Sequence, residues 1–325
     1  MDFEGTSAAH HLQRRGAYRV LIPTDKTGAT LTVENRTLRI TNLNKMFWPD
    51  AKITKGALLQ YYADIAPVLL PHIRERAMVM KRYPDGITGD YFYMKRTPRP
   101  RPDWIETCAI EHASGSVIDF PKVQDLPSLL WIINLGCIDL NPWYSRCDDR
   151  PDYLHFDLDP VAGEPPVPFS RVREAALRIK TALEALNMPS LAKSSGSRGI
   201  HVYVPLVRGP TQKQVWRFAK AFALKMAARH PELITAEYRI AKRPAGRVLA
   251  DYNQNAWGRT LASVYSVRPR PGAPVAVPLT WEEVANGFDI TDFTLRNVPA
   301  RVARLGDLWQ PLLEVRGRVR LEKFL

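Results

Sequence analysis

The sequence predicts a mixed-sheet protein of the α+β class, with helices flanking the sheets. Strand-like and helical segments are both present, and they follow one another without the strict alternation of an α/β fold. The composition, 45% hydrophobic and 24% charged, is that of a globular protein, and 325 residues suffice for one or two domains. We predict an N-terminal arm over residues 1–29 and a single domain over residues 30–325.

The first predicted elements are separated by turn-forming residues. Residues 30–41 alternate between apolar and polar on both sides of a Glu-Asn pair, which predicts a β-hairpin. Residues 53–73 have helical spacing, and Thr54 is placed to cap that helix. Residues 77–96 predict two strands around a Pro-Asp-Gly turn, and the apolar residues 125–140 predict a mostly buried helix.

The second half of the chain continues this mixed pattern. Residues 152–160 predict a strand, and residues 170–187 predict an amphipathic helix with Ser170 as its N-cap. Residues 190–206 predict two strands joined by a turn of Gly and Ser. The remaining predicted elements are a helix over 211–230, a strand with a polar turn over 246–255, an extended proline-rich stretch over 263–281 and a helix beginning in the segment TWEEVAN.

The charge of the chain indicates an anionic partner. The formal net charge is +13 and the pI is about 9.7, which favours binding to nucleic acid or to an anionic membrane. No apolar run reaches 18 residues, and no basic amphipathic helix with a strong apolar face stands out in the sequence. Nucleic acid is therefore the favoured partner, and no membrane association is expected.

The N-terminal residues and the cysteines predict an intracellular protein. The first residues lack the apolar stretch of a secretory signal, so we expect a cytoplasmic location. Cys108, Cys137 and Cys147 form no CxxC pattern and no paired framework, so they are expected to be reduced thiols.

Two carboxylates lie two residues apart in the predicted strand 152–160. Residues i and i+2 of a strand point to the same side, so Asp157 and Asp159 project together while Phe156 and Leu158 pack on the other face. Two like charges at this spacing are unfavourable unless a cation lies between them. A divalent ion is the simplest candidate, and oxygen ligands suit Mg²⁺ or Mn²⁺. The alternative is a solvated strand edge on which both carboxylates face water.

The segment SSGSRGIH has the chemistry of a phosphate cradle. Small residues in a tight turn let successive backbone N–H groups face an anion, and Arg198 and His201 add side-chain donors next to Ser195. The segment lacks the Lys-Ser/Thr ending of a P-loop. The alternative is an ordinary hairpin turn.

A third carboxylate follows an apolar run in RVLADYNQN. Asp251 is predicted to end a strand, where it can join the first pair or act as a turn residue. Three carboxylates with a phosphate cradle are what two-metal phosphoryl transfer requires, one ion activating a 3′-hydroxyl and the other steadying the leaving pyrophosphate.

Taken in order, FDLDP, SGSRGIH and ADYNQN resemble the archaeo-eukaryotic primase superfamily, and most closely the polymerase domain of bacterial ligase D, which acts in non-homologous end joining. The resemblance covers roughly residues 36–310 and implies a primase-polymerase catalytic fold. It also implies a template-dependent nucleotidyltransferase that adds nucleotides, preferably ribonucleotides and with Mn²⁺, to DNA 3′ ends at breaks or short gaps.

The resemblance implies roles for individual residues. Asp157, Asp159 and Asp251 would bind two metal ions as the catalytic set. The side chains expected to hold the incoming NTP or dNTP are those of Ser195, Arg198, His201, Lys81, Arg268 and Gln254.

The N-terminal half is similar to the family's DNA-binding region. Asn42, Lys45 and Lys55 would grip the 5′-phosphate across a DNA gap, although they could be solvated residues around a turn. Lys81 and Arg82 match a basic pair near the nucleotide and template, and Phe92 and Tyr93 match aromatics that stack on the template base. Adjacent strand residues face opposite sides, so core packing is the alternative for at least one of the aromatics.

Some features depart from the family or stay open. Asn141 stands where the family often has His, which puts a metal or phosphate role at that position in doubt. Residues 1–29 have no counterpart, and the chain lacks ligase and phosphoesterase regions, so it is either an excised domain or a stand-alone enzyme that works with separate partners. The resemblance suggests Ku and a separate DNA ligase as those partners. The alternatives are a gap-filling polymerase of excision repair, a primase, a metal-dependent phosphoesterase or nuclease, and a non-catalytic DNA end-binding scaffold.

Overall fold

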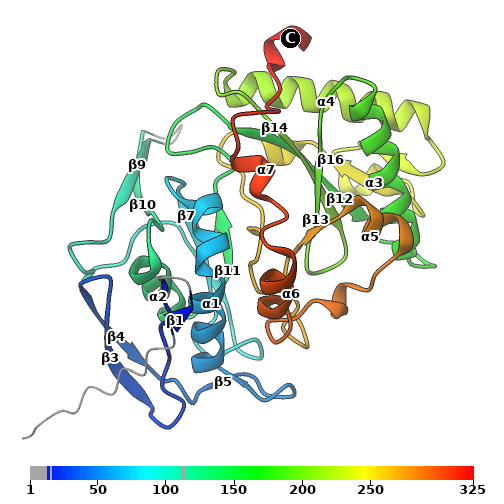
Figure 1. The fold of residues 1–325 in the computed structure, drawn as a ribbon. Helices are drawn as coiled ribbons and strands as arrows, with labels where there is room; N and C mark the ends of the chain where they lie inside the picture. Colours follow the sequence, from blue (N-terminus) through cyan, green and yellow to red (C-terminus); the bar gives the residue numbers. More distant parts are fainter. Residues whose placement is uncertain (1–12, 15–16, 112–114) are drawn as a thin grey trace, which may run out of the picture.

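A six-stranded mixed sheet forms one half of the computed structural model, which describes residues 13–14, 17–111 and 115–325 (Figure 1). All but one of its strand pairs are antiparallel, the exception being the edge pair β15 and β16. From one edge to the other the strands are β15 (Ile234–Thr235), β16 (Val248–Asp251), β12 (Tyr153–Pro160), β14 (Ile200–Pro205), β13 (Leu191–Ser194) and β17 (Pro278–Leu279).

Two amphipathic helices cover one face of this sheet. Helices α3 (Phe169–Glu184) and α4 (Gln212–Arg229) both contact β12 and β16. Leu154, Phe156 and Leu158 of β12 are fully buried, and the ring of Phe156 lies 4.9 Å from that of Phe222 on α4. Because alternate residues of β12 point to opposite faces, this packing sends Asp157 and Asp159 to the face away from these helices.

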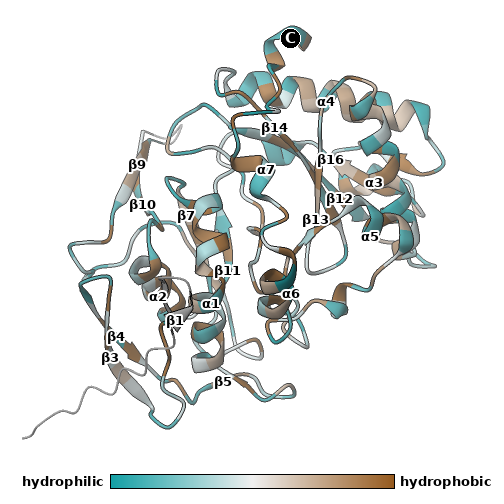
Figure 2. Ribbon diagram, in the orientation of Figure 1, coloured by the Kyte–Doolittle hydropathy of each residue, from teal (hydrophilic) through white to brown (hydrophobic). Residues whose placement is uncertain are grey.

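The other half of the molecule holds a smaller sheet and two helices. The order of this sheet is β11 (Cys137–Pro142), β7 (Met78–Arg82) and β8 (Phe92–Met94), and its two pairs are antiparallel. Helix α1 (Lys55–Ile73) packs against α2 (Leu126–Asn134), and Figure 2 shows hydrophobic colouring on both. The apolar residues of both halves form one continuous core.

Short hairpins and C-terminal helices complete the fold. The two-stranded units are β1 (Gln13–Arg14) with β2 (Ala17–Tyr18), β3 (Gly28–Val33) with β4 (Arg36–Thr41), β5 (Met46–Trp48) with β6 (Ile53–Thr54), and β9 (Thr107–Glu111) with β10 (Val117–Pro121). The last helices are α5 (Trp281–Asn286), α6 (Val298–Leu305) and α7 (Gln310–Leu313). No helix in the described ranges is long and apolar enough to cross a membrane.

Several predicted elements are confirmed, and two details are wrong. The hairpin over 30–41 and the Thr54 cap, whose side chain accepts a hydrogen bond from Ala57 N, are both present. The predicted helix 125–140 ends after Asn134 instead, because Gly136 adopts φ +84° and the chain then enters β11. Ser170 does not cap α3, which begins one residue earlier, after Pro168.

Much of the predicted N-terminal arm lies outside the described residues, but its end is packed on the domain. Ile22 is buried, and its backbone N–H donates to Gln60 of α1. The Arg19 guanidinium makes two hydrogen bonds to the Asp64 carboxylate on the same helix. Residues 19–22 therefore belong structurally with α1.

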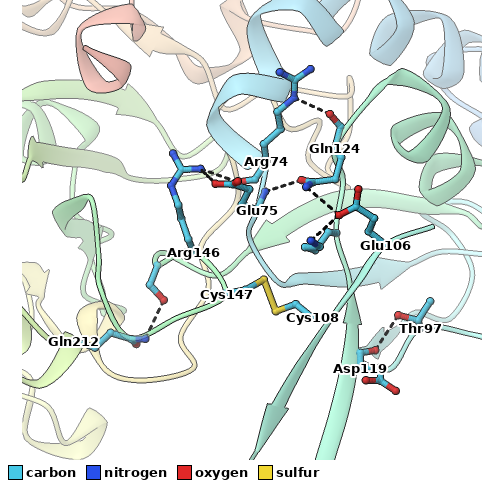
Figure 3. Close-up of a disulfide and its surroundings, with 12 residues drawn as sticks. Arg74, Glu75, Thr97, Glu106, Cys108, Asp119, Gln124, Arg146, Cys147 and Gln212 are labelled. Carbon is cyan, nitrogen blue, oxygen red and sulfur yellow. Dashed lines mark hydrogen bonds and ion pairs between the residues drawn. A yellow bond between two sulfur atoms is a disulfide. The ribbon is translucent and has the colours of Figure 1, made fainter. Parts of the chain in front are cut away.

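The prediction of three reduced thiols is wrong, because Cys108 and Cys147 form a disulfide (Figure 3). Cys108 lies on β9, and that hairpin packs through Ile110 and Phe120 against Val79 and Trp143 of the smaller half. This packing brings two cysteines 39 residues apart in sequence to a Cα–Cα distance of 6.1 Å. Spacing alone gave no sign of the pair, and Cys137 is buried without a disulfide partner.

We expect reduction of this disulfide to lower the free energy of unfolding by up to about 4 kcal/mol, because the bridge closes a long loop in the unfolded chain. Urea unfolding with and without a thiol reductant measures the difference. Cys147→Ser is the control, since it should be as unstable as the reduced protein and insensitive to the reductant. A reductant effect of equal size on Cys147→Ser would contradict the assignment.

Candidate functional site

Strand register brings the three predicted aspartates together. Asp157 on β12 is directly opposite Asp251 on β16, and Asp159 lies two residues further along the same face. On its other side Asp157 is opposite His201 of β14. The carboxylates therefore come from the neighbouring strands β12 and β16, on the face that α3 and α4 leave open.

Burial and mutual repulsion act on all three carboxylates, of which Asp157 is buried and Asp159 and Asp251 are half-buried. Burial raises the pKa of Asp157 above its ordinary value, and burial followed by the charge of Asp157 raises the pKa of Asp159 further. The pKa of Asp251 is raised by the same two causes. Like charges held this close in low dielectric favour protonation unless a cation intervenes.

The donor set fits divalent cations of the Mg²⁺ or Mn²⁺ kind. All three groups offer carboxylate oxygens, and Asp157 Oδ1 is a buried acceptor without a hydrogen-bond partner among the described residues. In the same part of the chain, no group of three or more Asp, Glu, His or Cys side chains is arranged to hold a metal ion by itself. Ions of this kind would therefore complete their coordination with water and substrate oxygens, as Mg²⁺ usually does.

Residues that follow Asp251 fix its carboxylate. Asn253 N donates to Oδ1 at 2.8 Å, and Gln254 Nε2 donates to Oδ2 at 3.1 Å. Gln254 was predicted to contact the nucleotide, and the structure gives it this hydrogen bond to the third aspartate. Asn255 is buried and joins the same turn to β12, since its side chain accepts from His155 N and donates to His155 O.

The cradle turn is organised by the hydroxyl of Ser195. Its Oγ accepts hydrogen bonds from the backbone N–H groups of Ser197, Arg198 and Gly199, at 3.2, 3.2 and 2.9 Å. These N–H groups point into the turn, and the Arg198 side chain is exposed beside it. The positive charge of Arg198 acts on Asp159, where it lowers the pKa of the carboxyl group that burial raises.

Glycine is required where the cradle meets the carboxylates. A Cβ at Gly199 would lie 2.4 Å from Leu158 O and 2.6 Å from Asp159 Oδ1. Gly196 adopts φ +64°, and a Cβ there would lie 2.7 Å from Cγ of Arg268. The two glycines therefore let the turn, Asp159 and Arg268 approach closely.

His201 lies beside the first aspartate as a neutral imidazole. Its Nε2 is 3.2 Å from Asp157 Oδ1. Burial, followed by the charges of Lys193 and Arg268, holds the pKa of His201 well below its ordinary value. A neutral ring can donate one hydrogen bond without adding positive charge to the site.

Arg268 and Lys81 are the two predicted nucleotide-binding cations that lie outside the cradle turn. Arg268 donates from Nη1 to Ser195 O at 3.0 Å, and its charge opposes the raised pKa of both Asp157 and Asp159. Lys81 is half-buried on β7, with Nζ 4.1 Å from the centre of the Tyr91 ring. Burial lowers the pKa of Lys81, while the charge of Asp139 raises it.

Sequence reasoning missed two charged groups of this site. Lys193 is fully buried on β13, and its pKa is lowered to about 7, first by burial and then by Arg268. Asp139 is 2% exposed on β11. Lys193 lies in the segment 190–206, predicted to form two strands, and Asp139 in the predicted helix 125–140. A charged residue within an apolar segment was the sequence signal that could have identified each of them. The side chain of Asn141, which stands at the family's histidine position, donates to the backbone oxygen of Asp139.

A second cluster of cations lies around the start of α1. Lys55 Nζ donates to Thr41 O at 2.7 Å and to Asn134 Oδ1 at 2.9 Å.

Two further cations act on Lys55. Its pKa is lowered to about 8 by burial, then by the charges of Lys45 and Arg82. The structure thus brings Lys55, Lys45 and Arg82 together beside the turn at Asn42, whose backbone O accepts from Lys45 N. Lys45 also forms an ion pair with the exposed Asp85.

The predicted aromatic pair is exposed on β8. Phe92 and Tyr93 expose 41% and 60% of their surface, so neither is a core residue. The Arg82 guanidinium lies 5.2 Å from the centre of the Phe92 ring, and Lys81 Nζ lies 5.6 Å from that of Tyr93. Tyr91, which the sequence analysis did not select, is also exposed and extends this surface.

The chain is similar to known proteins over most of its length. The family model described as LigD, primase-polymerase domain, matches residues 54–309. The multifunctional non-homologous end joining protein LigD of Mycolicibacterium smegmatis is 30% identical over 279 residues, which are 85% of this chain. The bifunctional non-homologous end joining protein LigD of Bacillus subtilis is 30% identical over 271 residues, 83% of this chain.

The chain spans only part of these curated relatives. It covers 36% of the Mycolicibacterium protein and 43% of the Bacillus protein. A solved structure agrees over nearly its whole length: the polymerase domain of Mycobacterium tuberculosis ligase D in complex with DNA superposes with a TM-score of 0.80 at 28% identity. That match covers 85% of this chain and 98% of the solved one.

We expect Asp159→Asn to stabilise the metal-free protein at neutral pH. Folding raises the pKa of Asp159, so the folded state holds protons that the unfolded state releases, and stability falls as pH rises through this window. Thermal unfolding in EDTA should therefore show a higher Tm for the variant near pH 7.5 and a smaller difference near pH 5. Mn²⁺ should raise the Tm of the unsubstituted protein more than that of the variant.

The exposed carboxylate of Asp50 provides the control for this experiment. Asp50→Asn should leave both the pH dependence and the Mn²⁺ response unchanged. A Tm of Asp159→Asn that lies below that of the unsubstituted protein in EDTA at pH 7.5 would show that the carboxylates do not repel one another as described.

Proposed function

This chain belongs to the LigD primase-polymerase domain family, and from that premise we propose that it is a DNA-directed nucleotidyltransferase. It extends DNA 3′ ends at double-strand breaks or short gaps, with a preference for ribonucleotides, and it acts in non-homologous end joining. The observation that carries the proposal is the cross-strand pairing of Asp157 with Asp251, with Asp159 beside them and Arg268 above the cradle turn.

The chemistry follows from how these residues are held. The 3′-hydroxyl oxygen of the primer bonds to the α-phosphorus of the nucleotide, the bond from that phosphorus to the β-phosphate oxygen breaks, and pyrophosphate leaves. Divalent cations, when bound by Asp157, Asp159 and Asp251, supply the Lewis acidity for this transfer. The hydrogen bonds of Asn253 and Gln254 keep the Asp251 carboxylate in one orientation.

The triphosphate is assigned to the cations around the cradle. Arg268 and Arg198 present positive charge near the carboxylates, and Lys81 lies close to Arg268. Arg268 is fixed by its bond to Ser195 O. Charge-assisted hydrogen bonds to phosphate oxygens are the strongest contacts these side chains can make. Ser195 acts by shaping the turn, and His201 lies as a neutral ring beside Asp157, with Nε2 3.2 Å from Asp157 Oδ1.

The DNA is assigned to the exposed part of the smaller half. The cluster of Lys45, Lys55 and Arg82, with Asn42, has the charge to bind one 5′-phosphate. Phe92 and Tyr93 offer exposed rings for stacking on a template base. The DNA substrate implies a place beside the bacterial chromosome in the cytoplasm, with Ku and a separate DNA ligase as partners.

We expect the double substitution Asp157→Ala, Asp159→Ala to reduce primer extension more than a hundredfold, because it removes about 3 kcal/mol or more of transition-state stabilisation. Extension of a labelled primer on gapped, overhanging and unprimed templates, with ribo- and deoxynucleotides and with Mn²⁺ or Mg²⁺, measures this. The exposed pair Asp25→Ala, Asp50→Ala should extend normally. Extension that survives in the Asp157, Asp159 variant would place the catalytic site elsewhere.

We expect gapped DNA with a 5′-phosphate to bind more tightly than the same DNA without it. Lys55 is cationic only below its pKa of about 8, so this advantage should fade as pH rises from 7 to 9, where the phosphate itself stays fully charged. Fluorescence anisotropy of both DNAs, at fixed salt because phosphate contacts are salt-dependent, measures the difference.

Two lysine variants separate the contact from general electrostatics. Lys45→Met should remove most of the 5′-phosphate advantage without disturbing the buried bonds of Lys55. The exposed Lys52→Met should retain it. Equal affinity of the unsubstituted protein for both DNAs at every pH would end this assignment.

A further inference from the structure

One buried carboxylate next to the site has no part in the function proposed above. Asp139 lies on β11, directly opposite Lys81 of β7, and only 2% of its surface is exposed. Its Oδ1 has no hydrogen-bond partner among the described residues, and its Oδ2 lies 3.5 Å from Arg268 Nε. A carboxylate this deeply buried with so few hydrogen bonds is costly to maintain unless nearby cations compensate it.

Three cations from separate strands and loops surround this carboxylate. Lys81 comes from β7, Lys193 from β13, and Arg268 from the loop that leads towards β17. Burial lowers the pKa of both lysines. The charge of Asp139 opposes this at Lys81, and the charges of Asp157 and then Asp139 oppose it at Lys193. Lys193 has few other partners, since its Nζ donates only to Ser194 O, at 3.3 Å, among the interactions of the described chain.

Backbone contacts hold Asp139 and Arg268 in fixed register. The residue after Asp139, Leu140, donates from its N–H to Ser266 Oγ at 3.0 Å and accepts at its O from Ser263 N at 2.9 Å. Ser266 is two residues before Arg268. The smaller sheet is therefore joined to the segment that carries Arg268 by a hydrogen bond that is one residue from Asp139 and two residues from Arg268.

We propose that Asp139 is a positioning residue that holds the Arg268 guanidinium, and with it Lys81, ready for the triphosphate of the incoming nucleotide. The inference deepens the proposed polymerase function and rests on it. Arg268 is held at two points, by Ser195 O on the cradle and by Asp139 on the smaller sheet. Asp139 thus links nucleotide-binding groups that come from the two halves of the molecule.

The physical reason is preorganisation. A free arginine side chain has many rotamers, and immobilising it when the nucleotide binds costs entropy, whereas Asp139 immobilises it in advance. If the negative charge of Asp139 were removed, the buried cations Lys81, Lys193 and Arg268 would also repel one another. Asp139 touches neither primer nor template in this assignment, so its loss should affect the nucleotide and not the DNA.

The test compares Asp139→Asn and Arg268→Lys, singly and together, by steady-state primer extension. Asp139→Asn should raise the KM for the nucleotide about tenfold or more and lower kcat less, while the Kd for gapped DNA stays unchanged. Asp139→Glu should recover part of the KM. In the Arg268→Lys background, Asp139→Asn should have little further effect on KM, because the two residues act as one unit.

Several outcomes would overturn the proposal. An unchanged KM in Asp139→Asn would do so, as would effects of the two substitutions that add in full. If the Kd for gapped DNA rose in Asp139→Asn as much as the KM for the nucleotide, the role of Asp139 would be structural only. The same would hold if Asp139→Asn and Asp139→Glu both lowered the Tm while the KM of the folded protein stayed normal. The exposed Asp25→Asn is the control. If the unsubstituted protein itself extends no primer, the polymerase proposal fails, and this result is distinct from a normal enzyme that ignores Asp139→Asn.

Discussion

The repulsion between three carboxylates that the strand register forces together is the constraint on which the rest of the site depends. The ladder between β12 and β16 places Asp157 opposite Asp251, and the pleat places Asp159 on the same face. Backbone hydrogen bonds and the apolar residues beneath them hold this geometry against the electrostatic cost. The glycine at 199, the bonds from Asn253 and Gln254, and the neutral His201 all serve an acidic cluster whose position is set by the sheet.

A second requirement is that two halves of the molecule meet correctly above this cluster. Buried polar contacts join them: Arg76 Nη2 donates to both carboxylate oxygens of Asp152, and His72 Nε2 of α1 lies 2.8 Å from Asp307 Oδ2. Tyr265 donates to the other oxygen of Asp307 at 2.8 Å. Each pair links the smaller half to the central sheet or to the C-terminal segment. Buried pairs of this kind add little net stability compared with apolar packing, but they fix orientation because each partner is costly to leave unpaired.

The sequence allowed a good deal of this to be predicted where the physics is local. The period of two placed Asp157 and Asp159 on one face, and Thr54 was found as a cap from its position before an apolar helix. The features that could not be predicted from the sequence depend on contacts between distant segments. The pairing of Cys108 with Cys147 and the roles of Asp139 and Lys193 arise only when the smaller sheet packs near the larger one. Ser195 was selected for the right turn, but no sequence rule says that its hydroxyl collects three N–H groups of that turn.

The charges of the site explain why a protein with a net charge of +13 can hold an acidic centre. Asp139, Asp157, Asp159 and Asp251 are matched by Lys81, Lys193, Arg198 and Arg268, so the centre is close to neutral. The surplus positive charge therefore lies elsewhere, including the cluster of Lys45, Lys55 and Arg82, where it can attract a phosphate backbone. A centre that is balanced when empty stays balanced only if positive ions and a negative triphosphate enter together. A triphosphate that enters together with its metal ions adds less net charge to this buried place than the triphosphate would alone, so the electrostatics of the fold favour joint binding of metal and nucleotide.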